Sequence, residues 1–297
     1  MLSAPPSPRP RPALWPPLFA FVAALLLVLT LTTGLVLAVG AVRAAGEPAQ
    51  IGPQVARFAA SAAGIMSAAT LSAAVLVLTA IVAAALDPRA GSAPLADRLH
   101  LGRSRASVLG TAAGVVGMIG LGMLAGTASD LLGARRASGP LPQIAEALSH
   151  LGGLGSAGFW LALLTIAIAP GIAEETFFRG YLLPRFSARW GLRGGIAASA
   201  TAFGLMHLDP VQGTIALVAG VYLGWLAARL GGIRPTMTAH ATNNALFVAF
   251  APQMYVPGGA RATDLAVLGA GAVLLASAIA VLRSPAALSL RAPRSAA

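Results

Sequence analysis

Two adjacent carboxylates, Glu174 and Glu175, close an apolar run of the sequence, and Arg179 follows four residues after the second. On a helix, Glu175 and Arg179 stack in the favourable order of acid before base, whereas Glu174 points about 100° away. This pairing would keep Glu175 ionised and fixed, and would leave Glu174 free to turn into a cavity as a general base. We therefore predict that Glu174 is catalytic. Taken alone, the three residues fit an ordinary solvated helix end equally well.

Two histidines lie downstream of this pair at helical spacing. His207 follows Phe203 by four residues, and His240 precedes Asn244 by four, so each pair shares one face of a helix. Imidazole and carboxamide groups donate hydrogen bonds, and in a dry site such donors stabilise an oxyanion. His240 and Asn244 are therefore candidate site residues. A lone histidine at the end of an apolar run is usually a hydrogen-bonded core residue, so the spacing alone does not single out His207.

The other polar residues have plainer interpretations. Asp209 directly precedes Pro210, which predicts a helix N-cap rather than a catalytic acid. His100 and His150 lie outside the apolar runs, so we expect them to be solvated. The chain contains no cysteine, which excludes disulfides, thiolate nucleophiles and zinc–cysteine sites.

The composition identifies lipid as the main solvent of the elements that must position these residues. The chain has 297 residues, of which 57% are hydrophobic and 10% are charged, whereas a soluble domain carries roughly 25% charged residues. The net charge of +11 comes from arginines scattered between apolar segments, without the aromatic-interleaved patch expected for nucleic-acid binding. We therefore expect an integral membrane protein that binds no nucleic acid.

Apolar runs predict an all-α, polytopic membrane helix bundle of about eight transmembrane helices. The first run is longer than the roughly 7–15 residues of a signal-peptide core, so we expect it to be retained. Residues 1–15 are predicted to be a disordered arm, 16–284 the membrane domain and 285–297 a tail. The expected spans are Leu18–Val42, Phe58–Leu86, Val108–Thr127, Gly158–Ala173, Gly194–His207, Val211–Ala228, Pro235–Phe250 and Leu265–Leu282.

The distribution of arginines predicts the orientation of the bundle. With the amino terminus in the cytoplasm, fifteen arginines lie inside and five outside, as the positive-inside rule requires. Both termini should then lie in the cytoplasm, and the helix bundle in the cell membrane. The inside set is Arg9, Arg11, Arg89, Arg98, Arg103, Arg105, Arg179, Arg185, Arg189, Arg193, Arg229, Arg234, Arg283, Arg291 and Arg294; the outside set is Arg43, Arg57, Arg135, Arg136 and Arg261.

Three patterns in this order resemble the motifs of the CAAX-protease and bacteriocin-processing family, over about residues 158–250. They are Glu174-Glu175-x-x-x-Arg179, Phe203-x-x-x-His207 and His240-x-x-x-Asn244. The resemblance implies an intramembrane endopeptidase in which Glu174 and His207 activate a water molecule. It further implies that His240 and Asn244 stabilise the oxyanion, while Glu175 and Arg179 organise the site.

A metal-dependent mechanism is the open alternative. One carboxylate and two histidines, here Glu174, His207 and His240, also form the ligand set of a catalytic zinc site. We favour a glutamate-activated water because His240 and Asn244 together are better explained as a donor pair than as metal ligands. No other cofactor is expected.

The expected substrate is a membrane-associated or carboxyl-terminal peptide, cut in a cavity that opens toward the cytoplasm. A non-catalytic immunity or assembly factor of the same fold is the first alternative. A proton or small-solute transporter is the second, although we find no internal repeat in its favour.

The position of His207 conflicts with the simple span order. That order places His207 at the outer end of its helix, while Glu174 and His240 lie toward the cytoplasm. A shared site requires the fifth span to be a short or tilted helix that ends at Asp209-Pro210; otherwise the resemblance misleads about His207.

Overall fold

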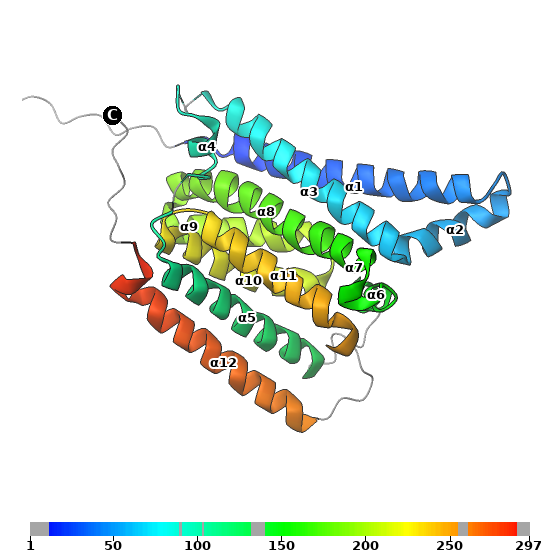
Figure 1. The fold of residues 1–297 in the computed structure, drawn as a ribbon. Helices are drawn as coiled ribbons and strands as arrows, with labels where there is room; N and C mark the ends of the chain where they lie inside the picture. The colour runs from blue at the N-terminus through cyan, green and yellow to red at the C-terminus, as the bar shows by residue number, and fades with distance from the viewer. Residues whose placement is uncertain (1–11, 89–90, 103, 132–139, 255–260, 290–297) are drawn as a thin grey trace, which may run out of the picture.

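The computed structural model describes residues 12–88, 91–102, 104–131, 140–254 and 261–289, and shows an all-helical bundle (Figure 1). Apart from one isolated bridge between Ala106 and Leu288, the regular structure of these residues is helical. The long helices are α1 (Trp15–Arg43), α3 (Ala62–Ala85), α5 (Val108–Leu131), α9 (Leu183–Met206), α10 (Pro210–Leu230), α11 (Arg234–Met254) and α12 (Arg261–Arg283). The shorter elements are α2 (Pro48–Ala60), α4 (Leu95–Arg98), α6 (Pro140–Ser149), η3 (Gly153–Gly155), α7 (Ala157–Ala162), η4 (Leu163–Ile168), α8 (Ala169–Glu174), η5 (Glu175–Leu182) and η6 (Pro285–Ala287). The predicted disordered residues 1–11 and the tail residues 290–297 lie outside the described part.

Six helical stretches of the described chain are long and apolar enough to cross a membrane, which makes this a multi-pass membrane protein. They are Trp15–Arg43, Ala62–Ala85, Val108–Ser129, Ala157–Met206, Pro210–Leu230 and Asp264–Arg283. The number of candidate spans is lower than the predicted number of about eight for two reasons. Two expected spans fall within the single 50-residue stretch Ala157–Met206, and α11 is not among the six because its polar residues, including His240 and Asn244, lower its hydropathy.

The 50-residue stretch folds back on itself at Gly191. This residue has φ 72° and ψ 170°, a non-helical conformation with positive φ that glycine adopts without steric cost. The Ser199 hydroxyl donates a 2.8 Å hydrogen bond to the carbonyl of Phe178, so the two arms lie side by side. The second arm is short and ends at Met206, just before the turn that leads to Asp209.

The beginning of α10 confirms the predicted role of Asp209. Its carboxylate accepts a 2.7 Å hydrogen bond from the backbone amide of Gln212, with Pro210 in the first turn. Asp209 is therefore an N-cap, and the helix that carries His207 is short, as the first of the two alternatives for that residue requires.

The helix ends near Arg98, Arg185, Arg229, Arg234 and Arg283 lie at the same end of the bundle, the end that carries α4 in Figure 1. This grouping agrees with the arginine distribution from which the orientation was predicted. The cytoplasmic location of both termini stays a prediction. Arg179, which also belongs to the predicted inside set, is instead buried within the bundle. The contacts that join the helix ends are Arg98 Nη1 to Ala84 O (3.1 Å), Arg105 N to Leu230 O (2.9 Å), Arg229 Nε to Leu282 O (2.7 Å) and Arg185 Nη2 to Asp87 Oδ2 (2.9 Å).

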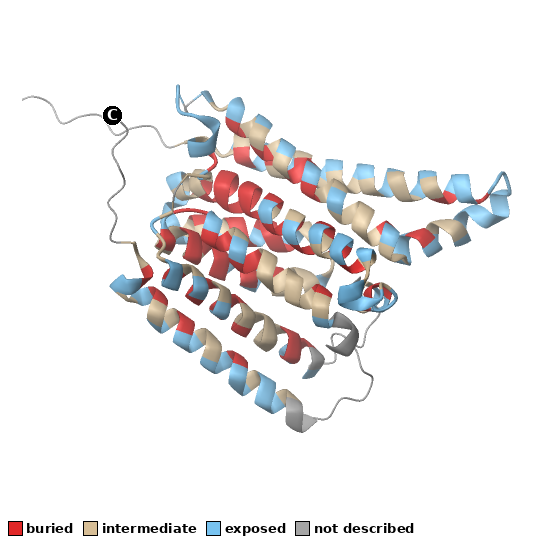
Figure 2. Cartoon of the chain, viewed as in Figure 1, coloured by how far each residue is buried: buried red, intermediate tan, exposed pale blue. Residues whose placement is uncertain are grey.

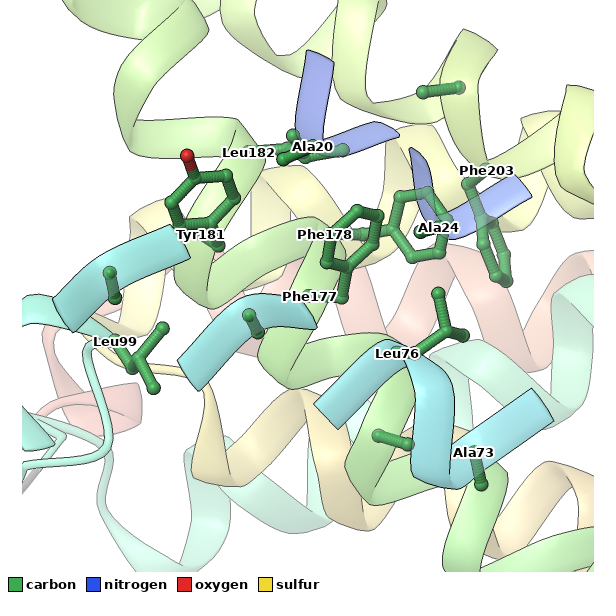
Figure 3. Close-up of a cluster of buried hydrophobic side chains, with 14 of the residues drawn as sticks. Ala20, Ala24, Ala73, Leu76, Leu99, Phe177, Phe178, Tyr181, Leu182 and Phe203 are labelled. Atoms are coloured by element: carbon green, nitrogen blue, oxygen red, sulfur yellow. The ribbon is translucent and has the colours of Figure 1, made fainter. Parts of the chain in front are cut away.

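The core of the bundle is built around η5, a π-helical segment whose eight residues are all buried. Figure 2 shows buried residues concentrated in the middle of the bundle, while α1 and α12 are mostly intermediate or exposed. In Figure 3, the rings of Phe177, Phe178 and Phe203 lie between alanines of α1 and the side chain of Leu76 on α3. Apolar side chains are therefore exposed on the outer helices, while the aromatic cluster forms part of the core around η5.

Candidate active site

Glu175 and Arg179 form the buried ion pair that their spacing predicts. Arg179 Nη1 lies 2.7 Å from Glu175 Oε1, and neither side chain is exposed. Arg179 Nη2 also donates to the backbone carbonyl of Gly220 on α10, at 3.2 Å. The arginine thus fixes one carboxylate and ties η5 to a helix 41 residues away in sequence.

His240 of α11 lies between the two carboxylates. Its Nδ1 is 3.0 Å from Glu175 Oε1, and its Nε2 is 3.6 Å from Glu174 Oε2. Because an ionised carboxylate only accepts hydrogen bonds, the contact with Glu175 places a proton on Nδ1. A proton on Nε2 would point toward the carboxylate of Glu174.

The two glutamates differ in environment, as expected from the 100° between them on a helix. The side chain of Glu174 is 20% exposed, whereas that of Glu175 is fully buried and held by Arg179 and His240. Glu174 therefore keeps part of its side chain exposed, whereas Glu175 is enclosed by its partners.

His207 joins the site through Phe203. Its Nδ1 lies 2.9 Å from the carbonyl oxygen of Phe203, which can only accept, so Nδ1 carries a proton and Nε2 is the nitrogen not engaged by this bond. The Phe203 ring lies 5.0 Å from the His207 ring and 5.8 Å from that of His240, between centroids. The fold therefore brings both histidines against one aromatic ring, although no direct contact between His207 and Glu174 occurs in the described residues.

Asn244 lies one helical turn beyond His240 on α11 and is partly buried. Within the described part of the chain its side chain makes no hydrogen bond, so its amide protons are available. The predicted roles of Asn244 and His207 stay predictions.

The three-ligand zinc alternative does not fit these side-chain positions. Among the described residues, no three His, Asp or Glu side chains are grouped so that they could hold a metal ion. Glu174 and His240 are neighbours, but among the described residues no hydrogen bond or ion pair joins His207 to either of them. We derive no step through a metal.

Close approaches between helices also hold the site together. The approach of α8 to α11 at Gly171 did not follow from the motif spacing. A Cβ added to Gly171 on α8 would lie 2.9 Å from Ala241 on α11, next to the contact between Glu174 and His240. Gly220 and Gly224, four residues apart on α10, also allow close packing, since added Cβ atoms there would meet Ala200 at 3.0 Å and Ile196 at 3.2 Å.

The site residues fall within one segment that matches a known family. Residues 156–246 match the type II CAAX prenyl endopeptidases described as Rce1-like. This segment is an Rce1-like domain. The Rce1-like domain begins at Ser156, the N-cap of α7, and ends two residues after Asn244. No curated protein and no solved structure matches the chain.

The match confirms the resemblance inferred from the three motifs. An Rce1-like domain implies a hydrolase of the protease class, with peptide substrates and a membrane setting. It covers about the segment expected from the motifs, and the amino-terminal helices α1, α3 and α5 lie outside it.

Proposed function

We propose that the chain is an intramembrane endopeptidase that hydrolyses peptide bonds with a water molecule activated by Glu174 and His207. The observation that carries this proposal is the placement of one imidazole, His240, between the partly exposed Glu174 and the buried Glu175. A carboxylate that could act as a base therefore lies beside an imidazole that could donate a hydrogen bond, the two functions that attack on a peptide carbonyl requires.

In the proposed reaction, Glu174 takes a proton from water while the water oxygen attacks the carbonyl carbon. The lone pair on His207 Nε2 orients the water or shares its proton. His240 Nε2 and the Asn244 amide donate to the developing oxyanion. The tetrahedral intermediate then collapses, the carbon–nitrogen bond breaks, and Glu174 returns the proton to the leaving amine.

The depth of the site within the bundle favours substrate entry from the arginine-rich end. His240 is six residues from Arg234 and Glu174 eleven from Arg185, so both lie roughly 9–16 Å inside that end at 1.5 Å per helical residue. We propose that this end faces the cytoplasm, in the cell membrane. Membrane-associated or carboxyl-terminal peptide segments could reach the site at this depth.

The proposal is tested by reconstituting the protein in vesicles with a peptide library and identifying new termini by mass spectrometry. Glu174→Ala and His207→Ala should abolish cleavage, and His150→Ala, at an exposed loop histidine, should leave it unchanged. Wild-type activity should survive a zinc chelator. Cleavage that no site substitution alters would refute the proposal, and the absence of any cleavage would favour the non-catalytic alternative.

A further inference from the structure

Phe203 is a core residue whose ring also contacts three charged or titratable side chains of the site. It is 2% exposed, on the second arm of α9. The Arg179 guanidinium carbon lies over its ring, 4.6 Å from the centroid. The rings of His207 and His240 meet it at 5.0 and 5.8 Å, and the planes are nearly perpendicular, at 89° and 81°.

These contacts have a common electrostatic origin. The face of an aromatic ring is negative and its edge positive, so a cation over the face is attracted and perpendicular ring pairs are preferred. Through its face, Phe203 holds the arginine that fixes Glu175. Through its ring contacts and its carbonyl oxygen, it limits the orientations of His207, whose Nδ1 lies 2.9 Å from that oxygen.

We propose that Phe203 is a positioning residue that sets the orientations of Arg179, His207 and His240 relative to one another. The expected effect of this role on kcat rests on the proposed peptidase function. The expected effect on the orientation of the two imidazoles does not. Without this ring, each histidine keeps its hydrogen bond to the Phe203 carbonyl or to Glu175 but loses the aromatic contact that limits its tilt, and the guanidinium of Arg179 loses the ring beneath it.

A neighbouring residue provides a matched control. Phe177 is also buried, at 0% exposure, and lies in the same aromatic cluster. Its ring contacts are with Phe178 at 5.1 Å and Tyr181 at 6.2 Å, and no ring contact joins it to a site histidine among the described residues. Phe177→Leu and Phe203→Leu therefore remove the same atoms from similar surroundings, but only the second removes the contacts with the site.

The kinetic test compares the two leucine variants on a peptide that the wild type cleaves. Phe203→Leu should lower kcat by about 10- to 100-fold, as expected for misoriented catalytic groups, with little change in KM. Phe177→Leu should lower thermal stability and leave kcat within about threefold of wild type. Equal effects of the two substitutions on kcat would overturn the proposal.

A second measurement is independent of catalysis. Histidine-selective ¹⁵N NMR on the protein in nanodiscs reports the tautomer and mobility of each of the four histidines. The signals of His207 and His240 should shift or broaden in Phe203→Leu and stay unchanged in Phe177→Leu. Replacing Phe203 by pentafluorophenylalanine, which keeps the ring but reverses its quadrupole, should change them as well. Unchanged histidine signals in both Phe203 variants would refute positioning, whereas changed signals without any peptide cleavage would refute only the peptidase function.

Discussion

Gly171 offers a test of how closely α8 and α11 must approach for the site to form. A methyl group at this position would lie 2.9 Å from the N, Cα and Cβ atoms of Ala241, whereas ordinary contact begins at 3.4 Å. Backbone atoms cannot rotate away, so Gly171→Ala should separate the helices by about 0.5 Å or more at this point, on the scale of the close packing in helix interfaces. The Glu174–His240 distance, already 3.6 Å, would lengthen with it. Since a misplacement of about 1 Å can cost roughly 100-fold in rate, we expect kcat to fall about tenfold or more.

The assay is steady-state cleavage in nanodiscs, beside thermal unfolding and circular dichroism of the same samples. Gly34→Ala is the matched control, because an added Cβ there meets nothing within 4 Å. Alanine favours helix over glycine at both positions, so intrinsic helix propensity does not distinguish them. A folded Gly171→Ala variant with wild-type kcat would refute the reasoning that the close approach sets the geometry of the site.

Three further substitutions separate stability from catalysis. Arg179→Met leaves Glu175 buried without its cation and should lower the free energy of unfolding by about 3–5 kcal/mol, measured by denaturant titration in detergent; a loss below about 1 kcal/mol would show that the pair is dispensable. Asp209→Ala removes the N-cap of α10 and should cost about 1 kcal/mol in the same titration, with kcat little changed; a large loss of kcat would instead indicate a catalytic role. Ser199→Ala removes a buried hydrogen bond between the two arms of the hairpin and should also cost about 1 kcal/mol, and an unchanged midpoint would contradict its bracing role.

Local features of the site followed from the sequence because they depend on helical periodicity alone. The stacking of Glu175 on Arg179 and the separate direction of Glu174 need only a helix, and the cap at Asp209 needs only its proline neighbour. The ordered motifs then identified the family of the segment that carries them.

Contacts between distant segments did not follow from the sequence. His240 meets Glu175 across 65 residues, and only the packing of α11 against η4 and α8 determines which of its nitrogens faces which carboxylate. Arg179 was counted among the cytoplasmic arginines under the positive-inside rule, but it is buried in the bundle, where a glutamate and a carbonyl oxygen offset the cost of removing it from water.

Hydropathy alone could not determine the number of spans either. A glycine that reverses a helix and a glycine that continues one contribute equally to an apolar average, so the turn at Gly191 and the short second arm were not distinguishable from a full crossing. That turn is what brings His207 to the same ring as His240.

The central claim, that Glu174 is the base of a water-dependent peptidase, is tested most directly by the isosteric Glu174→Gln variant in H₂¹⁸O. Wild type should place one ¹⁸O atom in each new carboxyl terminus, and the variant should lose at least about 100-fold in kcat while it keeps its fold, as removal of a general base predicts. Cleavage by Glu174→Gln at the wild-type rate would contradict the account.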